Sequence, residues 1–167
     1  RKVYPFLDEK KFKEYVGRPL AEIPAPDGNG SYDQYFLKPF FKSLENVGVI
    51  PEIVDNYQFY KDGKYIECTK TIIENRVKAR NILEKISGRQ LPKNWFPWTF
   101  KDENGKLCNG KFLRYEWPNV YFENEEGKEI VNNLEKGEGK LPWRLDWPSK
   151  WKILGVTFEA FGKDHAT

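Results

Sequence analysis

The sequence contains no methionine, one histidine and only two cysteines among its 167 residues. Cys68 and Cys108 lie far apart, and neither has a second cysteine close by. A disulfide scaffold or a cysteine zinc site needs such neighbours, so two ordinary thiols are expected instead. Because the sequence starts at Arg1, lacks methionine and stops at Thr167 in what reads as the start of a loop, we expect an internal part of a longer protein.

Long apolar runs and a strong charge of one sign are also missing. The mean hydropathy is −0.76, and no apolar run reaches the roughly 18 residues of a membrane-spanning helix. We therefore expect a soluble, cytoplasmic protein without a membrane partner. The net charge of +3 neither demands nor excludes an RNA partner, and the length suits one compact domain with or without a smaller insertion.

Aromatic residues, by contrast, are abundant. They make up 16% of the chain and include six tryptophans. Such side chains either fill a core or stack on bases and purine rings. We expect most of them in the core.

Apolar spacing predicts a helix-rich first half. Short helices are expected at 8–15 and 57–60, and a longer one from the N-cap Ser31 to Gly48. The β-branched run at 49–54 predicts a strand in a sheet covered by helices, because such strands are apolar on both faces. One long helix is predicted over 65–86.

The pattern changes near residue 91. Short apolar runs alternate with turn sequences at 102–105, 108–110 and 125–127, which predicts a small antiparallel β module over 91–139. A glycine-rich turn at 136–140 follows it. Beyond that turn, Pro148 suits the first residue of a helix to Leu154, and 156–161 predicts another sheet strand.

The segment Pro26–Gly30 contains two glycines but lacks the spacing of a dinucleotide loop or a P-loop. We interpret it as an extended, flexible linker.

Three consecutive stretches close the chain: Gly139-Lys140-Leu141-Pro142-Trp143-Arg144-Leu145-Asp146-Trp147-Pro148, Trp151-Lys152-Ile153-Leu154-Gly155-Val156-Thr157-Phe158-Glu159, and Phe161-Gly162-Lys163-Asp164-His165-Ala166. In the order and spacing of these residues, the chain resembles class I lysyl-tRNA synthetases. Looser similarity occurs at 1–3, 17–24 and 60–65.

This resemblance implies an α/β fold, namely part of a Rossmann-type catalytic domain at 1–90 and 140–167, interrupted by the antiparallel β insertion at 91–139. The family's two-histidine ATP signature would precede Arg1, its mobile lysine-rich ATP loop would follow Thr167, and a helical anticodon-binding cage would lie farther along. We therefore expect the isolated chain to be inactive. The inserted module of the family commonly carries paired zinc-binding cysteines, whereas this one has Cys108 alone, so no zinc is expected.

The resemblance also implies substrate contacts, although it assigns no catalytic residue. A doubly wound sheet binds ligands beyond the carboxyl ends of its strands, so Gly162 would approach the adenylate and Asp164 would bind the ribose hydroxyls. His165 would contact the substrate or adenylate. Trp143 would pack on the lysine stem and attract its ammonium group, and Asp146 would hold this segment or balance charge.

Each of these residues has a structural alternative. A Gly-x-Asp sequence after a strand is often only a turn, and a single histidine is often structural. The ring of Trp143 could fill the core beside Trp147 and Trp151. Asp146 could cap a helix that begins at Pro148.

The implied activity is ATP-dependent lysine–tRNA ligation. Its substrates would be lysine, ATP with Mg²⁺ and tRNA-Lys; the oligomeric state is open, with a monomer expected. Two other functions remain: a non-catalytic, synthetase-like RNA-binding or interaction module, and an aromatic β segment that binds single-stranded nucleic acid by stacking.

Overall fold

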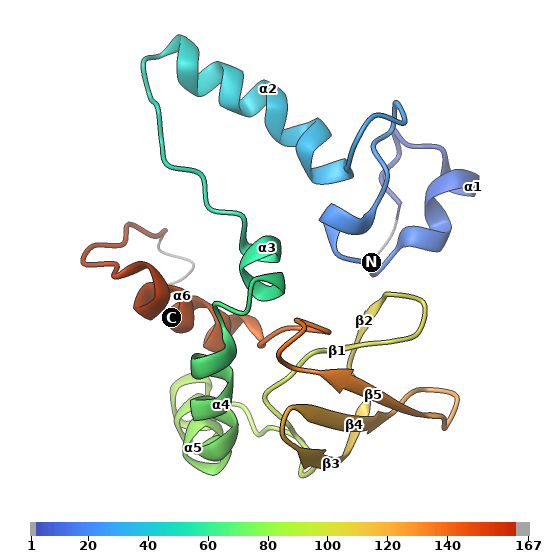
Figure 1. Ribbon diagram of the computed structural model, residues 1–167, viewed down its shortest axis with the longest axis vertical. Coiled ribbons are helices and arrows are strands. Elements are labelled where there is room, and N and C mark those ends of the chain that lie inside the picture. The colour runs from blue at the N-terminus through green and yellow to red at the C-terminus, as the bar shows by residue number, and fades with distance from the viewer. Residues whose placement is uncertain (1–2, 163–167) are drawn as a thin grey trace. The chain divides into compact units, whose positions relative to one another are not determined.

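A computed structural model describes residues 3–162 as a mixture of helices and small antiparallel sheets (Figure 1). The chain divides into two compact units. The first takes the chain up to Gln58 together with Lys101–Cys108, and the second takes Phe59–Phe100 and the chain from Asn109 onward. The mixed helix-and-sheet class agrees with the α/β expectation.

The first unit begins with short helices. α1 (Glu9–Phe12) is capped by Asp8, whose carboxylate accepts hydrogen bonds from the backbone N–H groups of the first turn. Two 3₁₀ turns follow, at Lys13–Tyr15 and Leu20–Glu22. α2 (Tyr32–Asn46) starts after Ser31 in the N-cap position. The predicted helices at 8–15 and 31–48 are thus confirmed.

The segment Pro26–Gly30 is a tight reversal and not the extended linker that we expected. The N–H of Ala25 donates to the carbonyl of Gly30 (3.0 Å), and the carbonyl of Ala25 accepts a hydrogen bond from the N–H of Gly28 (2.9 Å). Gly28 and Gly30 have φ angles of 83° and 82°, a backbone region that suits glycine. The two glycines therefore allow this segment to form a turn.

Two predicted strands are wrong within the described residues. The structure gives no strand at either 49–54 or 156–161, and the side chains of Ile50 and Phe158 are 89% and 84% exposed. A β-branched sequence shows only that a segment suits a sheet, because a strand also needs hydrogen-bonding neighbours. Neither segment has a strand neighbour among the described residues.

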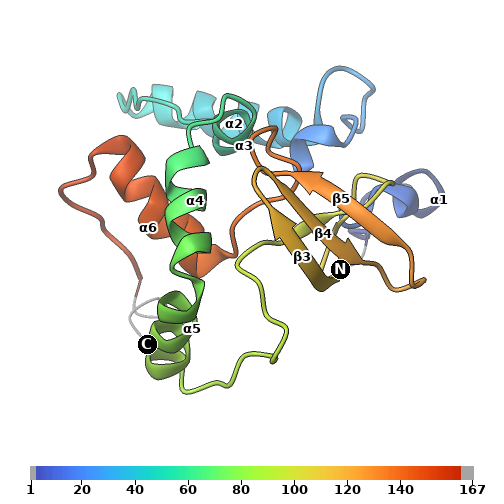
Figure 2. The ribbon, with the colours of Figure 1, turned by 60° about the horizontal axis from the view of Figure 1, so that its bottom comes forward.

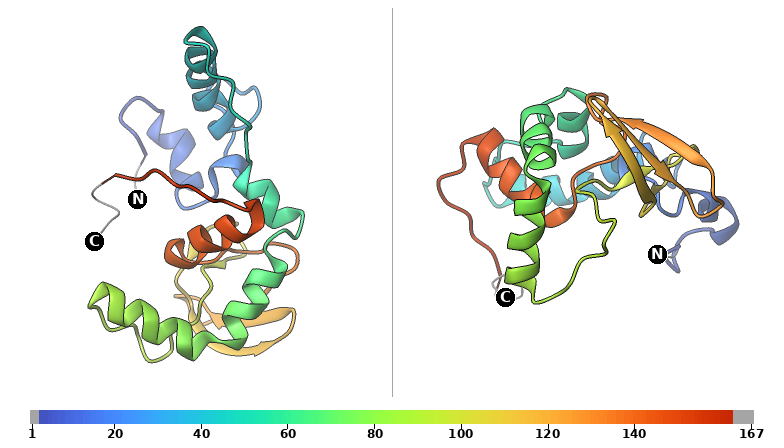
Figure 3. Two further views of the ribbon diagram at one scale, coloured as in Figure 1. Left: turned by 90° about the vertical axis from the view of Figure 1, so that its left-hand side faces the viewer. Right: turned by 90° about the horizontal axis from the view of Figure 1, so that it is seen from below.

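The second unit contains a pair of helices where one was expected. α3 (Asn56–Lys61), the predicted short helix, leads through a turn to α4 (Ile66–Glu74) and α5 (Arg76–Ser87). The break falls at Asn75, whose side-chain amide donates to the carbonyl of Thr71 (2.9 Å) and so competes with the helical pattern. Figure 3 shows α5 leaving the axis of α4. The predicted helix end near residue 86 is confirmed, with Gly88 in the C-cap position.

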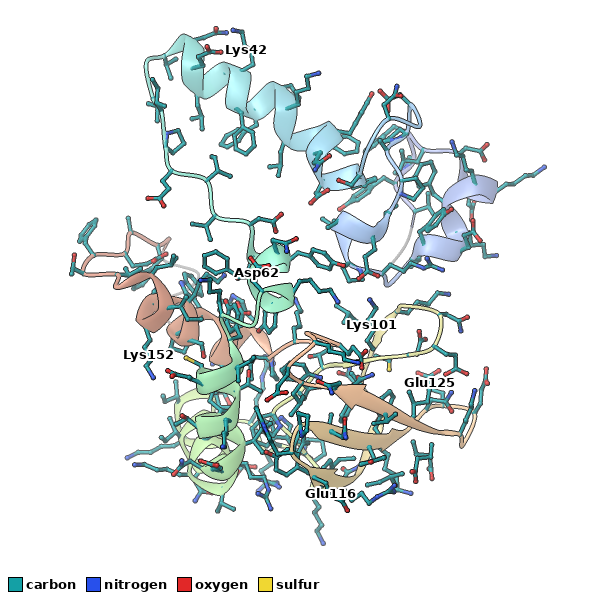
Figure 4. The ribbon with its side chains drawn as sticks, viewed as in Figure 1. Lys42, Asp62, Lys101, Glu116, Glu125 and Lys152 are labelled. Atoms are coloured by element: carbon teal, nitrogen blue, oxygen red, sulfur yellow. The ribbon has the colours of Figure 1, made fainter. Side chains whose placement is uncertain are left out.

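The predicted antiparallel strands are confirmed. β3 (Lys111–Glu116), β4 (Asn119–Glu123) and β5 (Glu129–Asn133) form a three-stranded meander, seen side by side in Figure 2. Glu125 lies in the β4–β5 turn and Glu116 at the end of β3 (Figure 4). β1 (Phe100–Lys101) and β2 (Leu107–Cys108) form a separate pair. The boundaries 91–139 remain a prediction.

Phenylalanines, more than the predicted tryptophans and tyrosines, fill the core behind the meander. Phe96 stacks on Phe112 and Phe100 stacks on Phe122, both with ring centroids 4.3 Å apart. Of the five tryptophans and tyrosines at 95–121, Trp98 alone is buried, and the others are half-buried: Trp95, Tyr115, Trp117 and Tyr121. Alternation along β4 places Val120 and Phe122 inward, which is why this face becomes the core.

We predict that Phe122→Ala lowers the free energy of unfolding by about 3–5 kcal/mol, because the ring is fully buried and leaves a cavity. The exposed Val131, on the neighbouring strand, serves as the control, and Val131→Ala should cost less than about 1 kcal/mol. Urea unfolding followed by circular dichroism measures both. Equal losses would contradict this assignment of the core.

Candidate active-site segment

The segment that carries the strongest resemblance folds as α6 (Trp143–Leu154). We expected its first residues to be extended and the helix to begin at Pro148, and both expectations are wrong. The carbonyl of Pro142 accepts hydrogen bonds from the N–H groups of Leu145 (2.8 Å) and Asp146 (2.9 Å). These bonds close the first helical turn early, so Trp143 is the first residue of the helix and Pro148 lies inside it.

The chain reaches this helix through a closely packed glycine turn. The predicted turn at 136–140 is confirmed, and Gly137 has a φ of 61°. A Cβ atom on Gly137 would lie 2.8 Å from the carbonyl oxygen of Tyr60, so only glycine fits there without a shift. Beyond it, Thr99 and Lys140 exchange two backbone hydrogen bonds (2.7 and 3.0 Å) that set the path into α6.

A buried tyrosine holds the start of α6 from behind. Tyr60 in α3 is 6% exposed, and its hydroxyl donates to Oδ1 of Asp146 at 2.7 Å. The hydroxyl oxygen of Tyr60 also accepts a hydrogen bond from the N–H of Leu141 at 3.1 Å. The ring stacks on Tyr65 with centroids 3.9 Å apart and meets Trp98 edge-on. Both the ring and the hydroxyl of Tyr60 are therefore fixed.

The carboxylate of Asp146 is fully engaged. It is 7% exposed, and its second oxygen, Oδ2, lies 3.2 Å from the ammonium nitrogen of Lys150 one turn along α6. Burial, reinforced by the adjacent negative charge, raises the pKa of Tyr60 far above the ordinary tyrosine value. The hydroxyl thus keeps its proton and stays a donor. Since α6 starts at Trp143, Asp146 does not cap a helix that begins at Pro148.

The outer face of α6 carries three tryptophans. Trp143, Trp147 and Trp151 recur at four-residue spacing, with neighbouring ring centroids 5.2 and 6.3 Å apart. They line a hollow of about 350 Å³ with four further residues: Lys150, Leu154, Val156 and Glu159. Lys152 lies on the same helix (Figure 4).

Trp143 itself is 51% exposed. The guanidinium carbon of Arg144 lies 5.8 Å from the centre of its ring, so the π face already attracts a cation. This exposure favours a binding role for Trp143 over the core-filling alternative.

The structure places the predicted site residues unequally. Trp143 and Asp146 share the first turn of α6. Gly162 is exposed and follows Phe161, whose ring lies 6.5 Å from that of Trp147. The segment leading to Gly162 therefore meets the tryptophan face. Asp164 and His165 lie outside the described residues.

Tyr60 was missed by sequence reasoning. Its partners Leu141 and Asp146 stand 81 and 86 residues away along the chain. No local pattern signals such a pairing, and only the tyrosine-rich run around 57–65 marks the region as unusual.

Within residues 3–162, no three histidine, cysteine, aspartate or glutamate side chains come together in a way that could hold a metal ion. No helix in this part of the chain has the length and apolarity needed to cross a membrane. Cys68 is buried and Cys108 is half-buried, and neither forms a disulfide.

We predict that Tyr60 makes the folded state lose stability above about pH 10. The folded state keeps the hydroxyl proton where the unfolded state releases it, so stability is complete below the ordinary pKa and falls as the pH rises. The slope for one such group is at most about 1.4 kcal/mol per pH unit. Urea unfolding at increasing pH should show a shallower decline for Tyr60→Phe than for the unchanged chain; identical slopes would contradict the burial of this hydroxyl.

Comparison with known proteins supplies the family. The pattern described as tRNA synthetases class I (K) matches residues 1–167. The lysine–tRNA ligase of Methanocaldococcus jannaschii is 41% identical over 178 residues, which cover 99% of this chain and 32% of that protein. The lysine–tRNA ligases of Methanosarcina barkeri (40% over 170 residues, 100% of this chain and 32% of theirs) and Thermoplasma volcanium (36% over 166 residues, 99% and 33%) match similarly.

This chain therefore spans about a third of the length of these curated relatives. The family pattern covers the whole printed sequence, so the match does not rest on α6 alone. The resemblance noted from the sequence is confirmed: the chain belongs to the class I lysyl-tRNA synthetase family.

Proposed function

We propose that the protein containing this chain is a lysine–tRNA ligase and that this chain supplies part of its lysine site. The observation that carries the proposal is the match, along essentially the whole chain, to relatives named lysine–tRNA ligases. In the proposed reaction, the lysine carboxylate attacks the α-phosphate of ATP and releases pyrophosphate. The aminoacyl group then passes to the 3′-terminal adenosine of tRNA-Lys, which releases AMP.

Trp143 is the proposed lysine contact. Its half-exposed ring stands at the start of a helix that the buried Asp146 anchors. A rigid aromatic face suits the apolar stem of lysine, and its π electrons attract the terminal ammonium. Asp146 acts in this proposal as a support for the segment.

The nucleotide belongs to the other end of the site. Gly162 and Asp164 are the proposed contacts for the adenylate, and His165 for the substrate beside it. ATP enters as a substrate together with its Mg²⁺; the proposal assigns that ion no ligands among residues 3–162, where no cluster suited to a metal occurs. Catalysis of this kind depends mainly on positioning and charge stabilisation.

The Rossmann-type domain is part of the same proposal. The exposed side chains of Ile50 and Phe158 support a larger domain in which other segments cover them. That cover would come from the remaining two thirds of a protein as long as its relatives. The isolated chain is accordingly proposed to be inactive.

Lysine-dependent ATP–pyrophosphate exchange by the full-length protein tests this function. We predict exchange with lysine, and a rise of roughly 10- to 100-fold in the lysine KM for Trp143→Ala, because the variant loses aromatic contact and cation–π attraction of about 2 kcal/mol. The lysine KM of Trp143→Phe should fall between those of the unchanged protein and Trp143→Ala, since phenylalanine keeps an aromatic ring. His165→Ala should lower exchange as well.

Trp117→Ala is the matched control, because it removes a tryptophan from the β3–β4 turn and not from α6. It should leave the lysine KM unchanged, with folding of every variant checked by circular dichroism. Exchange with no amino acid would favour the non-catalytic RNA-binding or interaction module. An unchanged lysine KM in folded Trp143→Ala would remove Trp143 from the site.

A further inference from the structure

One hydroxyl connects both ends of the segment that presents Trp143. Tyr60 Oη accepts the N–H of Leu141, two residues before Trp143, at 3.1 Å. It donates to the carboxylate of Asp146, three residues after Trp143, at 2.7 Å. Between these two anchors, the carbonyl of Pro142 closes the first helical turn. The backbone of Trp143 is thus held on both sides by a single oxygen.

The anchors are buried, so nothing replaces the hydroxyl if it is lost. Leu141 is fully buried and Asp146 nearly so. Without the hydroxyl, the N–H of Leu141 loses its acceptor and Oδ1 of Asp146 loses its donor, and a buried polar group left in that state is costly. Lys150 remains on the other carboxylate oxygen only, and its own side chain is partly exposed.

The tyrosine ring is held independently of the hydroxyl. It stacks almost parallel to Tyr65, with an interplanar angle of 3°, and packs edge-on against Trp98. Phenylalanine at this position keeps those contacts. A Tyr60→Phe variant therefore removes the two hydrogen bonds while leaving the aromatic packing in place, which separates positioning from general stability.

We propose that Tyr60 is the positioning residue of the lysine site: its hydroxyl joins Leu141 to Asp146 and so holds Trp143 at the start of α6 in the orientation that receives lysine. This inference rests on the lysine-binding role proposed for Trp143. Tyr60 touches neither lysine nor ATP in this proposal. It acts through the backbone of the segment and through Asp146.

The test compares exchange kinetics of the full-length protein with those of Tyr60→Phe. A lysine contact that is misplaced weakens binding in the ground and transition states alike, which raises KM and leaves kcat unchanged. We predict a lysine KM about tenfold higher, with kcat and the ATP KM within about twofold of their original values. A merely structural role would instead reduce the active fraction and lower kcat at constant lysine KM.

The double variant Tyr60→Phe/Trp143→Ala shows whether Tyr60 acts on the lysine KM through Trp143. If Tyr60 acts through Trp143, Tyr60→Phe adds no further rise in lysine KM once Trp143→Ala is present, because residues on one path are not additive. Tyr57→Phe is the matched control: it removes another tyrosine-to-carboxylate hydrogen bond, 2.8 Å to Glu22, outside this network. It should leave the lysine KM unchanged.

An unchanged lysine KM in Tyr60→Phe, or a full additional rise in the Trp143→Ala background, would overturn the positioning role while leaving the proposed function standing. Absence of lysine-dependent exchange in the unchanged protein would overturn both. Should Tyr60→Phe fail to fold, Asp146→Ala is measured in the same two backgrounds. That variant removes the acceptor of the Tyr60 hydroxyl and so breaks its connection to α6, and the same outcomes decide.

Discussion

The hydroxyl of Tyr60 is the interaction on which the start of α6 depends. It lies between a backbone N–H and a carboxylate, both buried, and satisfies the two with one atom. The glycine turn must pass close to α3 for this geometry, and Gly137 permits that approach. Once Leu141 is fixed, the helix begins at Trp143, and the three tryptophans lie along its outer face.

Features governed by neighbouring residues could be predicted from the sequence. The short helix at 8–15, the end of α5 near residue 86 and the antiparallel strands between their turns all follow from contacts within a few residues. The start of α6 could not be predicted, because Pro148 has a strong local preference that a distant constraint overrides. The role of Tyr60 also depends on partners more than 80 residues away.

The candidate site could be predicted only in part, because the surroundings of its residues depend on distant parts of the chain. Family resemblance selected Trp143 and Asp146, and the structure brings them into one helical turn with different surroundings: the tryptophan is half-exposed and the aspartate is buried. The spacing of residues along the sequence does not show which of two side chains is exposed to a ligand and which is buried beneath it. The two failed strand predictions concern segments that have no strand neighbour among the described residues, so the local pattern had no partner with which to form a sheet.

Hydrogen exchange at the Leu141 amide tests the central claim, that the Tyr60 hydroxyl fixes the start of α6, most directly. Because this N–H is buried and bonded to Tyr60, it should exchange slowly in the unchanged protein and markedly faster in Tyr60→Phe. The amide of Val120 in β4 should keep its rate in both. Fast exchange at Leu141 in the unchanged protein, or equal rates with and without the hydroxyl, would contradict the account.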